Sequence, residues 1–265
     1  MSRRSALRIL SAGFAIVFAL GTAAAETADV HLAPTGTLRA VYLEGNPAQA
    51  SQDPQTGAIS GIAVDLANGL AKRAGAPLAI TPVRGVQGVI DAVAGGSANI
   101  GFLANDPSRA GPIVFSETYL RNPQGVLTLT EAALDAIEDI YAPGVKIGVL
   151  RGDSIALWMA RNKPDVILVL RDANGPSEID LLKSGAIDGF AGNRLRLSAL
   201  AQSNAELRML PGSIMGVPQA IIVKAGNHEG LAAVNAFIDE SRANGFLQSS
   251  IAKAANGTEM EPAPE

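Results

Sequence analysis

The chain has 265 residues with 21 basic and 25 acidic side chains, a formal net charge of −4, and no cysteine. An acidic chain argues against nucleic acid and anionic lipid as general partners, because both require basic surface. The absence of cysteine excludes disulfide bonds and a lipid anchor on an N-terminal cysteine. The two histidines, His31 and His228, have no partner at metal-ligand spacing, so we expect neither a metal nor a cofactor.

The first 25 residues have the pattern of an export signal. Three arginines precede an apolar segment at 9–20, and the three alanines at 23–25 are suited to cleavage, so we expect the mature chain to begin at Glu26. Ser2-Arg3-Arg4 also resembles a twin-arginine signal, which leaves two export routes open. Residues 1–25 hold three arginines and no acidic residue, so 18 basic and 25 acidic side chains remain, a net charge of −7. No later segment has the roughly 18–20 apolar residues of a membrane span, which predicts a soluble exported protein.

The next part of the chain alternates between apolar runs and helical patterns. In chain order we expect a strand at 37–43, a helix at 61–74, a strand at 78–83, a helix at 86–94 and a strand at 99–104. This βαβαβ order predicts a parallel sheet with right-handed crossovers.

The same order starts again near residue 145. We expect a strand at 145–150, a helix at 154–161, a strand at 166–170, a helix at 177–184 and a strand at 187–191. Extended segments at 124–129 and 218–223 connect the two units, and a helix at 231–244 closes the fold. The predicted fold class is therefore α/β, with two Rossmann-like βαβαβ lobes joined by a two-strand hinge. The predicted division is a signal peptide at 1–25, lobe 1 at 26–123 with 218–253 returning to it, lobe 2 at 124–217, and a flexible tail at 254–265.

One stretch points to a binding site. The apolar run before residue 105 breaks at Asn105-Asp106-Pro107, and Arg109 follows directly. A cation just beyond the carboxyl end of a buried strand lies where open α/β sheets bind ligands. The chain contains no P-loop, no dinucleotide glycine motif and no G-x-S-x-G. The stretch therefore predicts capture of an anion without catalytic residues beside it.

Four segments carry a resemblance to a known family. They are Asp53–Gly57 with Gly61–Asn68, Arg109 with Phe115-Ser116 and Tyr119, Lys183–Asp188, and Ala220–Asn227 with Val234-Asn235 and Gly245. In this order they resemble the type II periplasmic solute-binding proteins, specifically extracellular solute-binding family 3, whose members feed ABC importers. The resemblance covers residues 36–253. It implies a monomeric periplasmic receptor that closes on a small molecule and delivers it to an inner-membrane ABC permease without covalent chemistry.

The resemblance also implies roles for particular residues. Arg109 matches the arginine that holds the ligand's α-carboxylate through two parallel hydrogen bonds, although a surface salt bridge is the alternative. Ser154 opens a helix of the second lobe, where backbone N–H groups and a hydroxyl would face the same anion; an ordinary N-cap is the alternative. Asp153 departs from the hydroxyl residue of the family and adds a negative charge there.

Four further residues are candidates for the ligand site. Asn193 stands where amino-acid binders carry the aspartate that pairs with the ligand's ammonium group, and an amide supplies no charge. Unless the match is displaced by one residue or Asp188 takes this role, the site is not a standard α-amino-acid site. Glu44 ends the first strand, and Arg84, after the second, is either a cleft cation or a solvated loop charge. Phe102 is a possible substitute for the missing aromatic residues, with core packing as its alternative.

We therefore predict a receptor for a small anionic organic solute, with a polar amino acid as the second choice of ligand. Two alternatives remain. One is an accessory binding protein that serves a sensor or an exported oxidoreductase instead of a permease. The other is an enzyme like the periplasmic dehydratases related to the family, with Glu44 or Asp153 as general base or acid.

Overall fold

The computed structural model describes residues 30–172, 174–254 and 260–262, and the predicted signal peptide at 1–25 lies outside them. A ten-stranded mixed sheet runs through the molecule in the order β4-β1-β5-β11-β6-β9-β7-β8, with β10 and β12 also paired to β6. Its strands are β1 (Leu38–Leu43), β4 (Leu78–Val83), β5 (Ile100–Ala104), β6 (Ile113–Leu129), β7 (Lys146–Leu150), β8 (Ile167–Arg171), β9 (Gly189–Asn193), β10 (Leu207–Met209), β11 (Met215–Lys224) and β12 (Glu261–Pro262). A separate two-stranded sheet joins β2 (Ser51–Gln52) and β3 (Ile59–Ser60).

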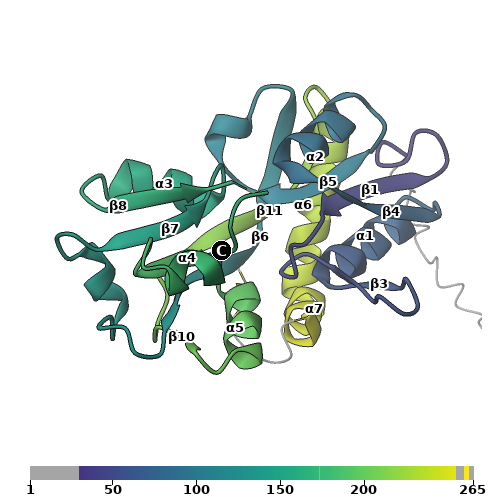
Figure 1. Cartoon of the computed structure of the whole chain (residues 1–265). Coiled ribbons are helices and arrows are strands. Elements are labelled where there is room, and N and C mark those ends of the chain that lie inside the picture. Colours follow the sequence, from purple (N-terminus) through teal and green to yellow (C-terminus); the bar gives the residue numbers. More distant parts are fainter. Residues whose placement is uncertain (1–29, 173, 255–259, 263–265) are drawn as a thin grey trace, which may run out of the picture.

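Lobe 1 forms around β1, which pairs in parallel with both β4 and β5. On one face pack α1 (Ile62–Arg73), α6 (His228–Ala243) and α7 (Phe246–Ala254), which bury the largest apolar cluster. On the other face packs α2 (Gly85–Ala94) over a smaller cluster. Figure 1 shows this lobe on the right. The central strand β5 is covered on both faces and is continuously apolar, whereas the edge strand β4 is only partly buried.

Lobe 2 repeats the arrangement around β7, which pairs in parallel with β8 and β9. Helix α3 (Ser154–Asn162) covers one face, while α4 (Glu178–Lys183) and α5 (Arg194–Ser203) cover the other. Two short 3-10 helices, η1 (Pro107–Arg109) and η2 (Ile137–Tyr141), lie in connecting segments. The two βαβαβ lobes predicted from the sequence are thereby confirmed.

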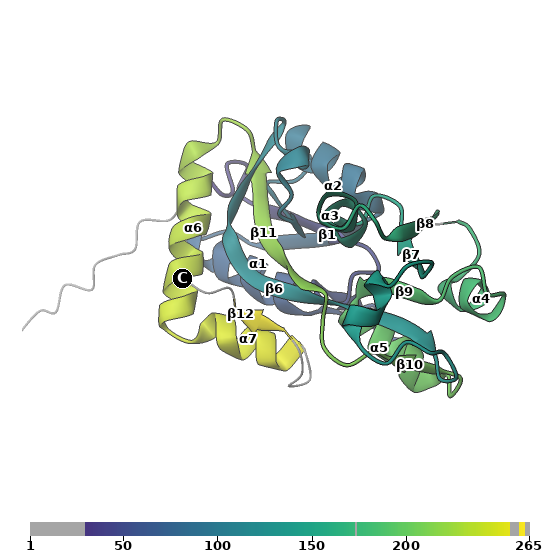
Figure 2. The ribbon, with the colours of Figure 1, turned by 90° about the vertical axis from the view of Figure 1, so that its left-hand side faces the viewer.

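Two long antiparallel strands join the lobes. β11 pairs with β5 of lobe 1, β6 pairs with β9 of lobe 2, and the two strands pair with each other from Ile113 to Gln124. Figure 2 shows β6 and β11 side by side between α6 and the strands of lobe 2. The carboxyl ends of the parallel strands in each lobe therefore face the space between the lobes.

Several elements differ from the sequence expectation. The segment expected at 124–129 is the end of a longer strand, β6, which begins at Ile113 because β11 and β9 supply partners along it. Helices α5 and α7 were not predicted. The letters RLRL at the start of α5 alternate like a strand, but Asn193 caps the segment as a helix by accepting a hydrogen bond from the Arg196 backbone N–H.

The C-terminal segment was expected to be a flexible tail. Residues 255–259 and 263–265 lie outside the described residues. Met260 is buried in the lobe 1 core, and Glu261–Pro262 pairs with β6 at Leu120 and Arg121.

Gly61 permits a close approach of two chain segments before α1. Its φ is +133°, and a Cβ at this position would lie 2.7 Å from the backbone oxygen of Gln49. The same oxygen accepts a hydrogen bond from the Ala63 N–H at 2.9 Å. The glycine therefore lets the loop that carries Gln49 lie directly on the first turn of α1.

We expect Gly61→Ala to destabilise the protein more than Gly111→Ala, as measured by urea unfolding. Gly111 is the matched control because its φ is +131° but nothing lies within 4 Å of its Cβ position. The backbone strain alone should cost about 1–3 kcal/mol in both variants. The steric overlap should add about 1–3 kcal/mol in Gly61→Ala only. Equal losses in the two variants would show that the close approach is unimportant.

Candidate functional site

A cavity of 650 Å³ lies between the lobes at the carboxyl ends of their strands. We call it the central cavity. From lobe 1 it is lined by Leu43–Asn46, Gln49, Gly85, Val86, Leu103, Ala104 and Arg109. From lobe 2 it is lined by Leu150–Ser154, Arg171, Asn193 and Arg196, and from the hinge strands by Asn122, Gln124, Val217 and Gln219.

Arg109 enters the central cavity from the loop after β5. Asp106 begins the 3-10 turn by accepting hydrogen bonds from the Ser108 backbone N–H at 2.9 Å and the Ser108 hydroxyl at 2.8 Å. Nη1 of Arg109 then donates to the Ala104 carbonyl at 3.0 Å, which fixes the side chain against the end of its own strand. Burial lowers the pKa of Arg109, and the nearby Asp106 and Asp153 partly offset this effect. The guanidinium remains a cation, because arginine does not lose its proton in folded proteins.

The same guanidinium contacts lobe 2. Nη2 of Arg109 donates to the Ser154 hydroxyl at 3.3 Å and lies 3.4 Å from the Gly152 carbonyl oxygen. Asp153 caps helix α3 by accepting a hydrogen bond from the Ser154 backbone N–H at 2.8 Å. Arg109 and Ser154, which are 45 residues apart in sequence, therefore meet across the cavity.

Asp153 lies within electrostatic reach of two arginines of the cavity wall. Burial raises the pKa of Asp153, and this outweighs the opposing effects of the Ser154 N–H bond and the positive charges of Arg109 and Arg196. The carboxyl group therefore retains its proton to a higher pH than an ordinary aspartic acid.

Asn193 joins the two lobes through its amide group. Its Nδ2 donates to Oδ1 of Asn46 at 3.1 Å, while its own Oδ1 accepts from the Arg196 backbone N–H at 3.2 Å. Both amide atoms are engaged, and neither brings a charge into the cavity.

The remaining three sequence candidates occupy different environments. Glu44 lines the central cavity and forms an ion pair with Arg84 at 2.8 Å. The Arg84 side chain is 91% exposed, so its charge is largely solvated. Phe102 is fully buried in the lobe 1 core, edge-to-face with Tyr119 at 6.2 Å between ring centroids. Among the described residues, neither Arg84 nor Phe102 lines the central cavity.

Sequence reasoning did not select three arginines that line the cavity. Arg151 follows β7, Arg171 ends β8, and Arg196 lies in the first turn of α5. The rule that selected Arg109, a cation at the carboxyl end of a strand, also applies to Arg151 and Arg171. Arg196 required knowledge of α5, whose helical start was not recognised.

Buried amide groups form the hinge side of the cavity. Gln49 Nε2 lies 3.4 Å from Oε1 of Gln219, and the Gln124 side chain donates to the Asn122 carbonyl at 3.1 Å. Each of these four residues is at most 3% exposed. The hinge strands thus present polar, uncharged groups, and the described part of the cavity wall holds four arginines against two carboxylic acids, Glu44 and Asp153.

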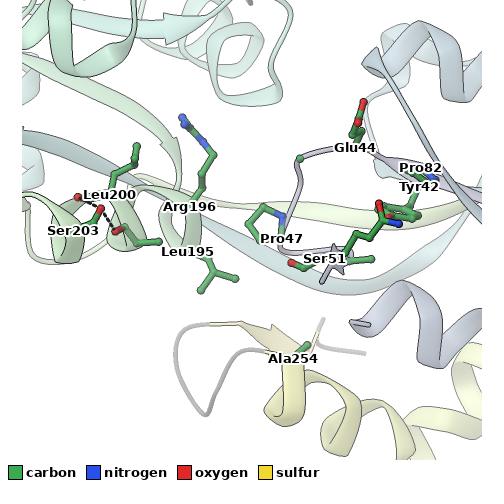
Figure 3. A pocket seen from close by; sticks show the side chains of 14 residues that line it. Tyr42, Glu44, Pro47, Ser51, Pro82, Leu195, Arg196, Leu200, Ser203 and Ala254 are labelled. Carbon is green, nitrogen blue, oxygen red and sulfur yellow. Dashed lines mark hydrogen bonds between the residues drawn. The ribbon is translucent and has the colours of Figure 1, made fainter. Parts of the chain in front are cut away.

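A second cavity of 770 Å³ adjoins the central one, and we call it the side cavity. Its walls are α5 on one side and the segments around Tyr42, Pro47 and Pro82 on the other (Figure 3). Glu44, Gly45 and Arg196 line both cavities. The two cavities therefore meet at these three residues.

The family of the chain follows from comparison with known proteins. Residues 38–256 match the model of the bacterial extracellular solute-binding proteins, family 3. The chain belongs to this family. The L-cystine-binding protein TcyJ of Escherichia coli strain K12 is 27% identical over 224 residues, covering 80% of each chain.

Solved structures of other proteins have the same fold as this chain. The solute receptor for L-cysteine of Neisseria gonorrhoeae has a TM-score of 0.68 at 21% identity, covering 86% of this chain and 93% of that one. An ancestral amino-acid-binding protein, described as a precursor of cyclohexadienyl dehydratase, has a TM-score of 0.68 at 22% identity, covering 85% and 97%. These matches confirm the predicted type II periplasmic binding protein fold.

The described residues contain neither a membrane-spanning helix nor a cluster of metal-binding side chains. No helix within residues 30–172, 174–254 and 260–262 is both long and apolar enough to cross a membrane. The same residues contain no group of three or more His, Cys, Asp or Glu side chains arranged to hold a metal ion.

An ion pair outside the central cavity also connects the lobes of this family 3 protein. Arg161 of α3 contacts Asp106 of lobe 1 at 3.3 Å, and the Asp106 side chain is only 5% exposed. Burial raises the pKa of Asp106. Its hydrogen bonds from Ser108 and its ion pair with Arg161 lower this pKa by more than burial raises it, so the net shift is downward. The ionised form therefore stabilises the folded, two-lobed arrangement.

We expect Asp106→Asn to lower the unfolding free energy by about 1–3 kcal/mol at neutral pH, because hydrogen bonds to a charged acceptor are lost. The folded-state pKa lies below the ordinary value of about 3.9, so this contribution is complete above that value and disappears as the pH falls through the folded-state pKa. Urea unfolding between pH 7 and pH 3 should show the two proteins converging at the acid end.

Asp91→Asn is the control for Asp106→Asn, because Asp91 is an exposed residue of α2. It should leave the pH profile of stability unchanged. A constant difference between wild type and Asp106→Asn down to pH 3 would contradict the assigned role of the carboxylate.

Proposed function

We propose that this protein is the solute receptor of an ABC importer and that Arg109 binds a carboxylate group of its ligand. The observation that carries the proposal is the position of Arg109 between the lobes, in contact with Ser154 and Gly152. A carboxylate bound by this guanidinium and the first turn of α3 would contact both lobes. Its binding would therefore favour the closed arrangement over an open one.

The proposal places the receptor in the periplasm. The family consists of extracellular solute-binding proteins, and residues 1–25 have the features of a cleaved export signal. We further propose that lobe 1 (26–123 and 218–253) and lobe 2 (124–217) move about the hinge strands, and that the closed form docks on an inner-membrane permease.

The charges of the cavity wall support an anionic organic solute as the ligand class. Arg109, Arg151, Arg171 and Arg196 exceed the two carboxylic acids in number, although the chain as a whole is acidic. Such a local excess of positive charge attracts anions into a cleft. Asn193 supplies no charge for an ammonium group, and its amide is bound to Asn46.

An amino acid is the second candidate ligand. The relatives named above include binders of L-cystine and L-cysteine. Glu44 and Asp153 line the cavity, and either carboxylate can pair with an ammonium group in place of the missing aspartate. Binding of an amino acid without binding of its deaminated analogue would favour this candidate over a simple carboxylate.

A dehydratase-like enzyme is a weaker alternative, favoured by two observations. One relative is described as a precursor of cyclohexadienyl dehydratase, and the pKa of Asp153 is raised, as a general acid at neutral pH requires. Mass spectrometry of a bound ligand after prolonged incubation separates the two functions, because a receptor releases its ligand unchanged.

We expect Arg109→Ala to abolish the thermal stabilisation that a bound carboxylate gives to the wild-type protein. Loss of a charge-assisted, two-bond contact should weaken binding by about 100-fold or more. The measurement is a thermal-shift screen of carboxylates, amino acids and decarboxylated analogues, followed by calorimetry on the compounds that bind.

Lys72→Gln is the control for Arg109→Ala, because Lys72 is an exposed cation in the last turn of α1 in the same lobe. It should bind the ligand as wild type does. Undiminished stabilisation of Arg109→Ala by the same carboxylate would refute the proposed role of Arg109.

A further inference from the structure

Arg196 lies where the central cavity and the side cavity meet. It belongs to the first turn of α5 and lines both cavities. Among the residues that the structure describes, only Glu44 and Gly45 do the same. In Figure 3 the Arg196 side chain extends upward from α5, and Glu44 lies on the segment across from it. A ligand held at Arg109 that extends toward the side cavity would therefore pass this guanidinium.

The positive charge beside Arg196 exceeds what the neighbouring acid needs. Arg196 forms an ion pair with Glu178, and Arg171 contacts the other oxygen of the same carboxylate at 3.5 Å. The Glu178 side chain is 7% exposed, so its charge requires a partner. One arginine would neutralise this carboxylate, yet two are present and both line the central cavity. The group thus keeps one net positive charge on the cavity wall.

The two acids of the cavity wall differ in their partners. Glu44 is paired with Arg84 at 2.8 Å. The positive charges of Arg109 and Arg196 both act to lower the pKa of Asp153, so its carboxyl group lies near both guanidinium groups. Arg151 pairs with Asp172 at 2.6 Å, and both of these side chains are mostly exposed. Arg109 and Arg196 are therefore two separate cationic positions with Asp153 near both.

We propose that Arg196, supported by Arg171 and Glu178, is a second anion-binding position, so that the ligand of this receptor carries two carboxylate groups. The inference rests on the proposed function, in which Arg109 binds the first carboxylate. The planar guanidinium of Arg196 donates to Glu178 through Nη1 and lies over the Phe190 ring at 5.9 Å, which holds it in place. Compounds with one carboxylate would occupy Arg109 and leave Arg196 without a ligand anion.

Two pairs of probes of matched size test the proposal by calorimetry on the purified mature protein. Glutarate carries two carboxylates and pentanoate one; L-glutamate and L-glutamine differ in the same way and also carry an ammonium group. We expect wild type to bind the member with two carboxylates roughly tenfold or more tightly in at least one pair. Arg196→Gln should lose this preference while its affinity for the other member changes less than about threefold.

Lys183→Gln is the matched control, because it removes a positive charge from an exposed ion pair elsewhere on lobe 2. It should retain the preference. Arg196→Lys keeps the charge without the planar group and should retain part of the preference, which provides a second variant if Arg196→Gln folds poorly. The comparison of probes on wild type stands without any variant.

The outcomes distinguish this inference from the proposed function. Equal binding of both members of each pair by wild type, with loss of both in Arg109→Ala, would overturn the second anion position and leave the role of Arg109 intact. Equal weakening of both members in Arg196→Gln would also overturn it. Failure of all four probes to bind wild type would count against both the carboxylate ligand and this inference.

Discussion

The guanidinium of Arg109 is a partly buried cation whose hydrogen-bond acceptors come from both lobes. A cation that leaves water must be paired, and here the acceptors are the Ala104 carbonyl in lobe 1 and the Ser154 hydroxyl and Gly152 carbonyl in lobe 2. The end of β5, the turn capped by Asp106 and the start of α3 all serve this arrangement. Moving the lobes apart would therefore remove the Ser154 and Gly152 acceptors from Arg109.

The chain as a whole is acidic, but arginines outnumber carboxylic acids on the described wall of the central cavity. Acidic side chains predominate in the sequence, but the carboxyl ends of the parallel strands direct arginines toward the space between the lobes. Two of these cations, Arg171 and Arg196, share the single carboxylate of Glu178. The cavity thereby retains an excess of positive charge while the folded protein avoids unpaired buried ions.

Much of the fold and part of the site could be predicted from local sequence patterns. The parallel strands of both lobes follow from the alternation of strand and helix patterns. The position of Ser154 near Arg109 was implied only by the resemblance to the family. Arg196 was not found, because the start of α5 alternates like a strand and its helical form depends on the Asn193 cap. Phe102 was considered for the ligand site, but its side chain is buried in the core.

The sequence by itself determined the fold class, the family resemblance and the cation expected to meet an anion, because periodicity and turn residues act over a few neighbouring positions. Only the tertiary structure decided which charges share the cavity. The contacts of Arg109 with Ser154, Asn193 with Asn46, and Arg161 with Asp106 span 45 to 147 residues. Their partners are set by how two lobes pack about β6 and β11, and no local pattern encodes that geometry.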